Sequence, residues 1–100
     1  MNNPFYFIIF LSFASLFGSF LSAESITVLL VDGQNNHNWK ATTPVLKQAL
    51  ESSGRFSVTV STSPARNGSK DDWAQWNPEF GSFDVTLSNY NAQTWPEPVQ

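Results

Sequence analysis

The alternation of apolar and polar residues divides the chain into strand and helix patterns. Residues 26–31 read ITVLLV, a nearly continuous run of β-branched residues and leucine that is typical of a strand covered on both faces. Residues 56–60 alternate apolar and polar side chains, which predicts a strand with one buried face, at or near a sheet edge. Residues 83–87, FDVTL, predict a third strand. Strands that alternate with helical patterns indicate a parallel sheet with helices on its faces.

The longer of the predicted helices follows the first strand and is expected over about residues 43–53. Thr42 or Thr43 can cap its start, because a hydroxyl oxygen accepts a hydrogen bond from a free backbone N–H. Its flanks are Pro44, which suits a first turn, and Gly54, which suits the position just past the end. The apolar side chains expected on its buried face are Val45, Leu46, Ala49 and Leu50.

A shorter helix is expected in the long segment between the second and third strands. Ser69 can cap it, since Asp71 and Asp72 would then occupy a first turn that favours negative charge. Trp73 and Trp76 lie three residues apart, and helical spacing makes them satellite core. A further helix is expected to begin after the Trp-Pro pair near the end of the chain.

The N-terminal segment differs from the rest of the chain. Residues 4–23 carry no charged side chain and hold a long apolar run that ends in small residues, the last being Ala23. This pattern predicts a secretory signal peptide, whereas an uncleaved membrane anchor through residues 5–21 and a buried core helix are the alternatives. We therefore expect an exported protein, periplasmic or extracellular, with residues 1–23 as signal peptide or anchor and residues 24–100 as an α/β domain.

Composition and charge restrict the function further. The net charge of −3 and the absence of a basic cluster argue against nucleic-acid binding. The chain has no Cys and one His, so we expect no metal site, and without a glycine-rich phosphate loop we expect no cofactor. Residues 24–100 make a small core without disulfides, which predicts the N-terminal part of a domain that is incomplete at its C-terminus. The oligomeric state is left open.

Candidate functional residues follow the first and third strands, because ligands of open α/β sheets bind at the loops after the strands. His37 is the candidate general acid or base, since an imidazole changes charge near neutral pH; a solvated or structural histidine is the alternative. Amides and indole rings suit sugar hydroxyls and sugar faces, although the tryptophans could instead pack their loops. The candidates for binding a substrate are Asn36, Trp39, Asn89, Tyr90 and Trp95.

The segments VLLVDGQNNHNW, TTPVLKQALESSGRFSVTV and FDVTLSNYN followed by WPEPVQ resemble the N-terminal half of ThuA-like domains, the trehalose-utilisation family. The resemblance covers residues 26–100 and implies a flavodoxin-like α/β fold similar to class I glutamine amidotransferases. It implies no amidotransferase activity, because the chain has no Cys. By position, the residues that match the family's pocket-edge motifs are His37, Trp39, Asn89 and Tyr90.

The resemblance also implies a role in carbohydrate metabolism, on disaccharides or their keto derivatives, with a small sugar as the ligand. The leading hypothesis is an exported ThuA-like protein that binds or processes a sugar at the carboxyl edge of a parallel sheet. The alternatives are a non-catalytic carbohydrate- or partner-binding module and a truncated product without activity. Whether the protein is an enzyme is left open.

Overall fold

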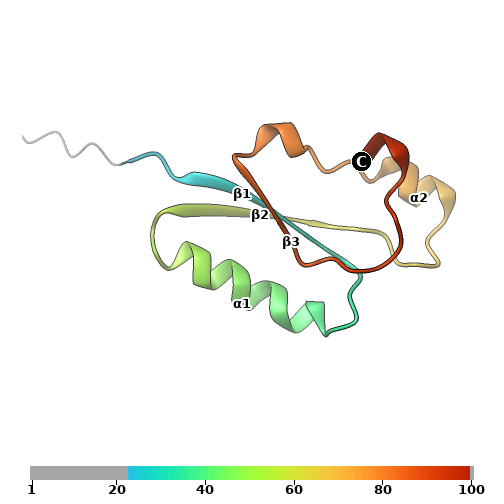
Figure 1. The fold of residues 1–100 in the computed structure, drawn as a ribbon, viewed down its shortest axis with the longest axis horizontal. Helices are drawn as coiled ribbons and strands as arrows, with labels where there is room; N and C mark the ends of the chain where they lie inside the picture. The colour runs from blue at the N-terminus through green and yellow to red at the C-terminus, as the bar shows by residue number, and fades with distance from the viewer. Residues whose placement is uncertain (1–22, 100) are drawn as a thin grey trace, which may run out of the picture.

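The computed structural model describes residues 23–99 and shows an α/β arrangement of three strands and four helical segments in that range (Figure 1). In chain order the elements are β1 (Ile26–Asp32), α1 (Trp39–Glu51), β2 (Phe56–Thr62), α2 (Lys70–Gln75), the 3-10 turn η1 (Phe80–Ser82), β3 (Val85–Ser88) and the 3-10 turn η2 (Glu97–Val99). The predicted leader lies outside the described residues except for Ala23. None of the helices described there has the length and apolar character needed to span a membrane.

The sheet is parallel, and β1 lies at its centre in the order β2-β1-β3. Val28 of β1 is opposite Val58 on one side and Val85 on the other. Flavodoxin-like sheets have this same order for their first three strands. The predicted flavodoxin-like α/β fold is therefore confirmed, and β2 is the edge strand that the alternating pattern indicated. All three strands end at one edge of the sheet, which brings their following loops together.

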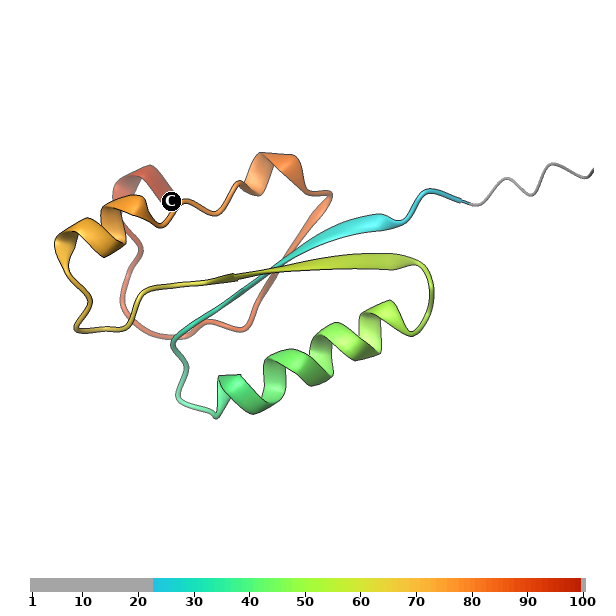
Figure 2. The same cartoon turned by 180° about the vertical axis from the view of Figure 1, so that it is seen from behind.

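Helices cover both faces of the sheet. On one face α1 packs over a core cluster made of Val28, Leu30 and Val58, with Leu46 and Leu50 against it. The segments α2, η1 and η2 lie on the opposite side of the sheet from α1 in both views (Figures 1 and 2). Because successive side chains of a strand point to opposite faces, Leu29 and Val31 belong to that second face, where both are buried.

An aromatic cluster forms on the segments beyond that second face. Its members are Trp73, Trp76, Phe80, Tyr90 and Trp95. The rings of Trp73 and Trp76 meet edge to face at 5.8 Å, and Trp76 meets Trp95 in the same way at 5.7 Å. The Trp76 indole N–H donates to the Ser61 hydroxyl at 3.1 Å, which anchors the cluster to β2. The expectation that Trp73 and Trp76 form satellite core is thus confirmed.

The helix α1 begins earlier than the sequence predicted. Its cap is Asn38, whose side-chain oxygen accepts a hydrogen bond from Ala41 N at 3.3 Å, so the prediction of Thr42 or Thr43 as the cap was wrong. Thr43 is buried inside the helix and donates to Asp32 instead. Pro44 consequently lies within the helix and not in its first turn.

The buried face of α1 was only half predicted. Leu46 and Leu50 pack on the core, whereas Val45 is 64% exposed and Ala49 is exposed as well. The helix lies over β1 and β2, so residues turned away from those strands face outward. In β2, likewise, Val58 is buried but Val60 is 36% exposed.

The third strand and the last helix are shorter than expected. β3 begins at Val85, and before it the Asp84 carboxylate accepts hydrogen bonds from the Thr27 backbone N–H at 2.8 Å and from its hydroxyl at 2.9 Å. Asp84 N also donates to the Thr27 carbonyl at 3.1 Å, so side-chain and backbone hydrogen bonds join β1 to the residue before β3. After Trp95 the chain forms a single 3-10 turn within the described residues.

The α2 helix agrees with its prediction. Ser69 accepts a hydrogen bond from Asp72 N at 3.0 Å, and the Asp72 carboxylate accepts one from Ser69 N at 3.0 Å. The two bonds form a reciprocal capping box, which satisfies two backbone donors that the helix itself leaves free.

Candidate functional site

A buried carboxyl group holds the three elements at the carboxyl edge together. Asp32, the last residue of β1, is 2% exposed. It accepts hydrogen bonds from the Thr43 hydroxyl of α1 at 2.7 Å and from the Thr62 hydroxyl of β2 at 2.6 Å. Both carboxyl oxygens are therefore used inside the protein, and Asp32 has a structural role.

The turn after β1 is tied to the loops that follow the other two strands. Gly33 has a φ of +119°, and Ser63 N donates to the Asp32 carbonyl beside it at 2.8 Å. The Gln34 side-chain amide donates to the Pro64 carbonyl at 2.8 Å, and the Gln34 carbonyl accepts from Asn91 N at 3.0 Å. Hydrogen bonds thus join all three loops at the carboxyl edge of the sheet.

Asn35 and Asn89 connect the first and third loops directly. The Asn35 amide nitrogen donates to the Asn89 side-chain oxygen at 3.2 Å and to its backbone carbonyl at 3.3 Å. The Asn89 amide nitrogen donates in turn to the hydroxyls of Thr42 and Thr43, each at 3.0 Å. The two loops therefore meet as predicted from the parallel sheet.

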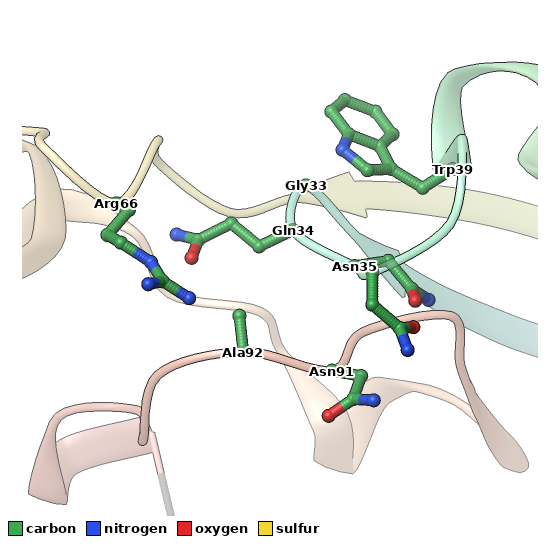
Figure 3. Close-up of a pocket in the computed structure, with 8 residues that line it drawn as sticks. Gly33, Gln34, Asn35, Trp39, Arg66, Asn91 and Ala92 are labelled. Carbon is green, nitrogen blue, oxygen red and sulfur yellow. The ribbon is translucent and has the colours of Figure 1, made fainter.

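A polar cavity of about 340 Å³ opens between these loops (Figure 3). Its walls are Gly33, Gln34, Asn35, Asn36, Trp39, Arg66, Asn91 and Ala92. Cavities that hold small molecules measure roughly 300–1,000 Å³, so this one lies at the small end of that range. The Gln34 carboxamide and the Arg66 guanidinium point toward one another across it in Figure 3. The polar cavity therefore combines side-chain amides, one indole and one positive charge.

The polar cavity contains a buried acceptor that the protein does not satisfy. Gln34 is 8% exposed, and its side-chain oxygen has no hydrogen-bond partner among residues 23–99. Buried polar atoms are nearly always paired, and leaving one unpaired costs about 1–3 kcal/mol. A hydrogen-bond donor brought in by a ligand would remove that penalty.

His37 lies apart from the polar cavity. Its side chain is exposed, and its backbone N donates to the Asn35 side-chain oxygen at 3.2 Å. It lines a separate, mainly apolar cavity of about 410 Å³ against α1, whose wall also includes Val45, Leu46 and Asn89. Within the described part of the chain, no group of three His, Cys, Asp or Glu side chains could hold a metal ion.

Tyr90 and Trp95 belong to the aromatic cluster and line neither of these two cavities. The Tyr90 hydroxyl donates to the Gln93 carbonyl at 2.7 Å. Burial raises the pKa of this phenol, while a hydrogen bond with Trp95 and the positive charge of Arg66 act in the opposite direction. These two candidates thus lie beside the polar cavity and not in its wall.

Of the predicted site residues, the polar cavity brings together Asn36 and Trp39. Sequence reasoning did not select Gln34 or Arg66, although both line it. The signal for Arg66 was its place after the second strand, because that strand ends at the same edge of the sheet as the first and third.

Fold and site together define a flavodoxin-like α/β protein with a polar cavity at the carboxyl edge of its sheet. The chain is similar to a protein of solved structure from Parabacteroides merdae that is described as ThuA-like, with 38% sequence identity and a TM-score of 0.70. The similarity covers 76% of this chain and 26% of that one. The matched part of the chain belongs to the ThuA-like family, and it spans about a quarter of the relative's length. No protein-family model and no curated protein matches the chain.

Proposed function

We propose that the polar cavity binds a sugar, and that the protein acts in carbohydrate metabolism as a ThuA-like protein. The observation that carries this proposal is the composition of the cavity wall: side-chain amides, an indole and the unpaired Gln34 oxygen around one small space. A sugar presents several hydroxyl groups, each both donor and acceptor, and an apolar ring face.

The chemistry of the wall suits such a ligand. Asn36 and Asn91 have no side-chain hydrogen bond within residues 23–99, so both amides keep a donor and an acceptor available. The Gln34 oxygen would accept from a hydroxyl and so gain its missing partner. Trp39 offers a flat face, and Lys40 lies over its ring at 5.6 Å, which restrains the indole.

Binding can be measured by calorimetric titration of the full-length protein with glucose and with trehalose. We expect Trp39→Ala and Asn36→Ala to weaken the affinity about tenfold each, which corresponds to about 1.4 kcal/mol. Asn77→Ala is the matched control, because Asn77 is exposed and does not line the polar cavity. The proposal fails if neither sugar binds, or if the cavity variants bind as tightly as the control.

His37 provides the test between an enzyme and a binding module. As a general acid or base it would have to reach the ligand from the neighbouring apolar cavity. In the catalytic version, His37→Ala abolishes turnover of a disaccharide and leaves its affinity nearly unchanged. In the non-catalytic version, the unaltered protein binds the sugar and shows no turnover above the rate of a heat-denatured sample.

Export is part of the same proposal, and it rests on the uncharged, apolar residues 4–23. N-terminal sequencing of the protein expressed with this segment should give Glu24 as the first residue if a signal peptidase removes it. An intact N-terminus in the membrane fraction would support the anchor, and an intact N-terminus in the soluble cell fraction would contradict export.

A further inference from the structure

A second cavity adjoins the polar cavity on the far side of Arg66. It measures about 480 Å³, and we call it the basic cavity. Its walls are Arg66, Gly68, Lys70, Trp73, Ala74, Gln93 and Pro96. Arg66 is in the wall of both cavities, so a ligand that extends past this side chain from one cavity would enter the other.

The basic cavity holds two positive charges that the protein does not neutralise. The chain has five Lys and Arg residues, and two of them, Arg66 and Lys70, line this one space. Neither forms an ion pair within residues 23–99, where the ion pair that does form joins Lys47 and Glu51. Both side chains are exposed, and an anion bound between them would be attracted by both charges.

The acidic residues nearest in the chain do not supply that anion. Asp71 follows Lys70 but does not line the cavity. The Asp72 carboxylate accepts the Ser69 backbone N–H at 3.0 Å and faces a different cavity, beside Thr62 and Trp76. The positive charge of the basic cavity is therefore available to a ligand.

A buried donor in the same wall also lacks a partner. Trp73 is 8% exposed, and its indole N–H has no acceptor within the described residues. Gly68 lies in front of it: a Cβ on Gly68 would come within 3.4 Å of this nitrogen and 2.9 Å of the Ala65 carbonyl. The glycine keeps open the space that an acceptor atom would occupy. A guanidinium, an ammonium and an indole N–H form a set of donors with no acceptor among them, which is what an anionic group requires.

We propose that the basic cavity is an anion subsite of the polar cavity, and that the ligand is a sugar bearing a carboxylate or phosphate group. The inference rests on the proposed function, because the sugar ring is placed in the polar cavity. Arg66 then binds the charged group from the wall that the two cavities share. Lys70 and the Trp73 indole complete the contacts on the far side.

The test compares three sugars on the full-length protein by calorimetric titration at low salt: glucose, glucuronate and glucose 6-phosphate. We expect at least one charged sugar to bind about ten times more tightly than glucose. Lys70→Gln should remove most of that preference and leave the affinity for glucose unchanged, since Lys70 lines only the basic cavity. Arg66→Gln should remove it as well. Glucuronate and glucose 6-phosphate distinguish a carboxylate from a phosphate ligand.

Arg55→Gln is the matched control, because it removes the same charge at the exposed amino-terminal end of β2. The anion subsite is refuted if glucose binds but neither charged sugar binds more tightly, or if Lys70→Gln behaves like Arg55→Gln. Inorganic phosphate that binds as tightly as glucose 6-phosphate would refute the sugar part. If no sugar binds, charged or neutral, the proposed function itself fails, so the two failures are distinguishable.

Discussion

Gly33 is the residue at the carboxyl edge whose replacement we expect to cost most. Its φ is +119°, a conformation that side chains with a Cβ rarely adopt. A Cβ there would lie 2.3 Å from the Ser63 hydroxyl oxygen, 2.6 Å from Ser63 N and 2.7 Å from Ser63 O. The hydroxyl could rotate, but the two backbone atoms cannot move alone. Ser63 N donates to the Asp32 carbonyl at 2.8 Å, so relief of the overlap would break that bond.

The cost of Gly33→Ala follows from two contributions. Holding a residue with a Cβ in a sparsely populated backbone region costs about 1–3 kcal/mol. Forcing extra volume into a packed site costs about 1–3 kcal/mol more. The free energy of unfolding should therefore fall by about 2–6 kcal/mol.

Two other glycines separate these contributions. Gly54 has a φ of +71°, and a Cβ added there would have no atom within 4 Å, so Gly54→Ala carries the backbone cost alone, about 1–2 kcal/mol. Gly81 also has open space and no positive φ, so Gly81→Ala should change stability by no more than about 0.5 kcal/mol. Urea titration followed by tryptophan fluorescence gives the midpoint for each variant. The reasoning is refuted if Gly33→Ala is no less stable than Gly54→Ala; a Gly33→Ala variant already unfolded without urea satisfies the expected order.

Three further changes test contacts at the two ends of the sheet. Asp32→Ala leaves the buried Thr43 hydroxyl and the exposed Thr62 hydroxyl without their acceptor and should cost about 2 kcal/mol or more in a urea titration; a loss under about 0.5 kcal/mol would contradict the framework role. The pKa of Asp84 is lowered by hydrogen bonds from the Thr27 backbone and hydroxyl. Its carboxylate therefore stabilises the fold above pH 3.8, and this stabilisation is lost as the pH falls through the lower pKa of the folded state. Asp84→Asn should therefore flatten the acid-induced loss of stability below pH 3.8, and an unchanged slope would count against it. Asn89→Ala removes the partner of Asn35 and should lower the melting temperature by about 4–8 °C, the equivalent of about 1 kcal/mol, and weaken sugar binding; a melting temperature within about 1 °C of the parent would refute it.

The fold could be predicted wherever one local pattern decided the structure. The apolar side chains of residues 26–31 are all removed from water only if both faces of the strand are covered, and β1 is buried in this way as expected. Ser69 and Asp72, three residues apart, form a capping box, so the start of α2 could be predicted from the local sequence. The start of α1 could not be predicted from the local sequence, because both Asn38 and Thr43 are residue types that cap helices well. A contact with Asp32, distant in the chain, decides that Thr43 lies inside the helix.

The position of the site was predictable, but its wall was not. Parallel strands end at one edge, which was enough to bring the loops after β1 and β3 together. Which side chains share a cavity depends on turn geometry. Because α1 already begins at Trp39, His37 and Trp39 line different cavities although they are two residues apart. Arg66 lies in an irregular segment without periodicity, where the sequence alone gives no direction for a side chain.

The asparagines of this edge show why residue type alone cannot assign a binding role. Asn38 caps α1, and the amides of Asn35 and Asn89 are hydrogen-bonded to each other and to the surrounding loops. An amide whose donors and acceptor are already used gains little from a ligand hydroxyl, since one hydrogen bond would only replace another. Under the proposed function, ligand recognition in the polar cavity depends on the groups that remain unpaired: Asn36, Asn91, the Gln34 oxygen and the Arg66 guanidinium. Three of these groups are neutral amides and the fourth is a cation. The affinity for an uncharged sugar therefore reports the contribution of the amides, and the additional affinity for an acidic sugar reports the contribution of the Arg66 guanidinium.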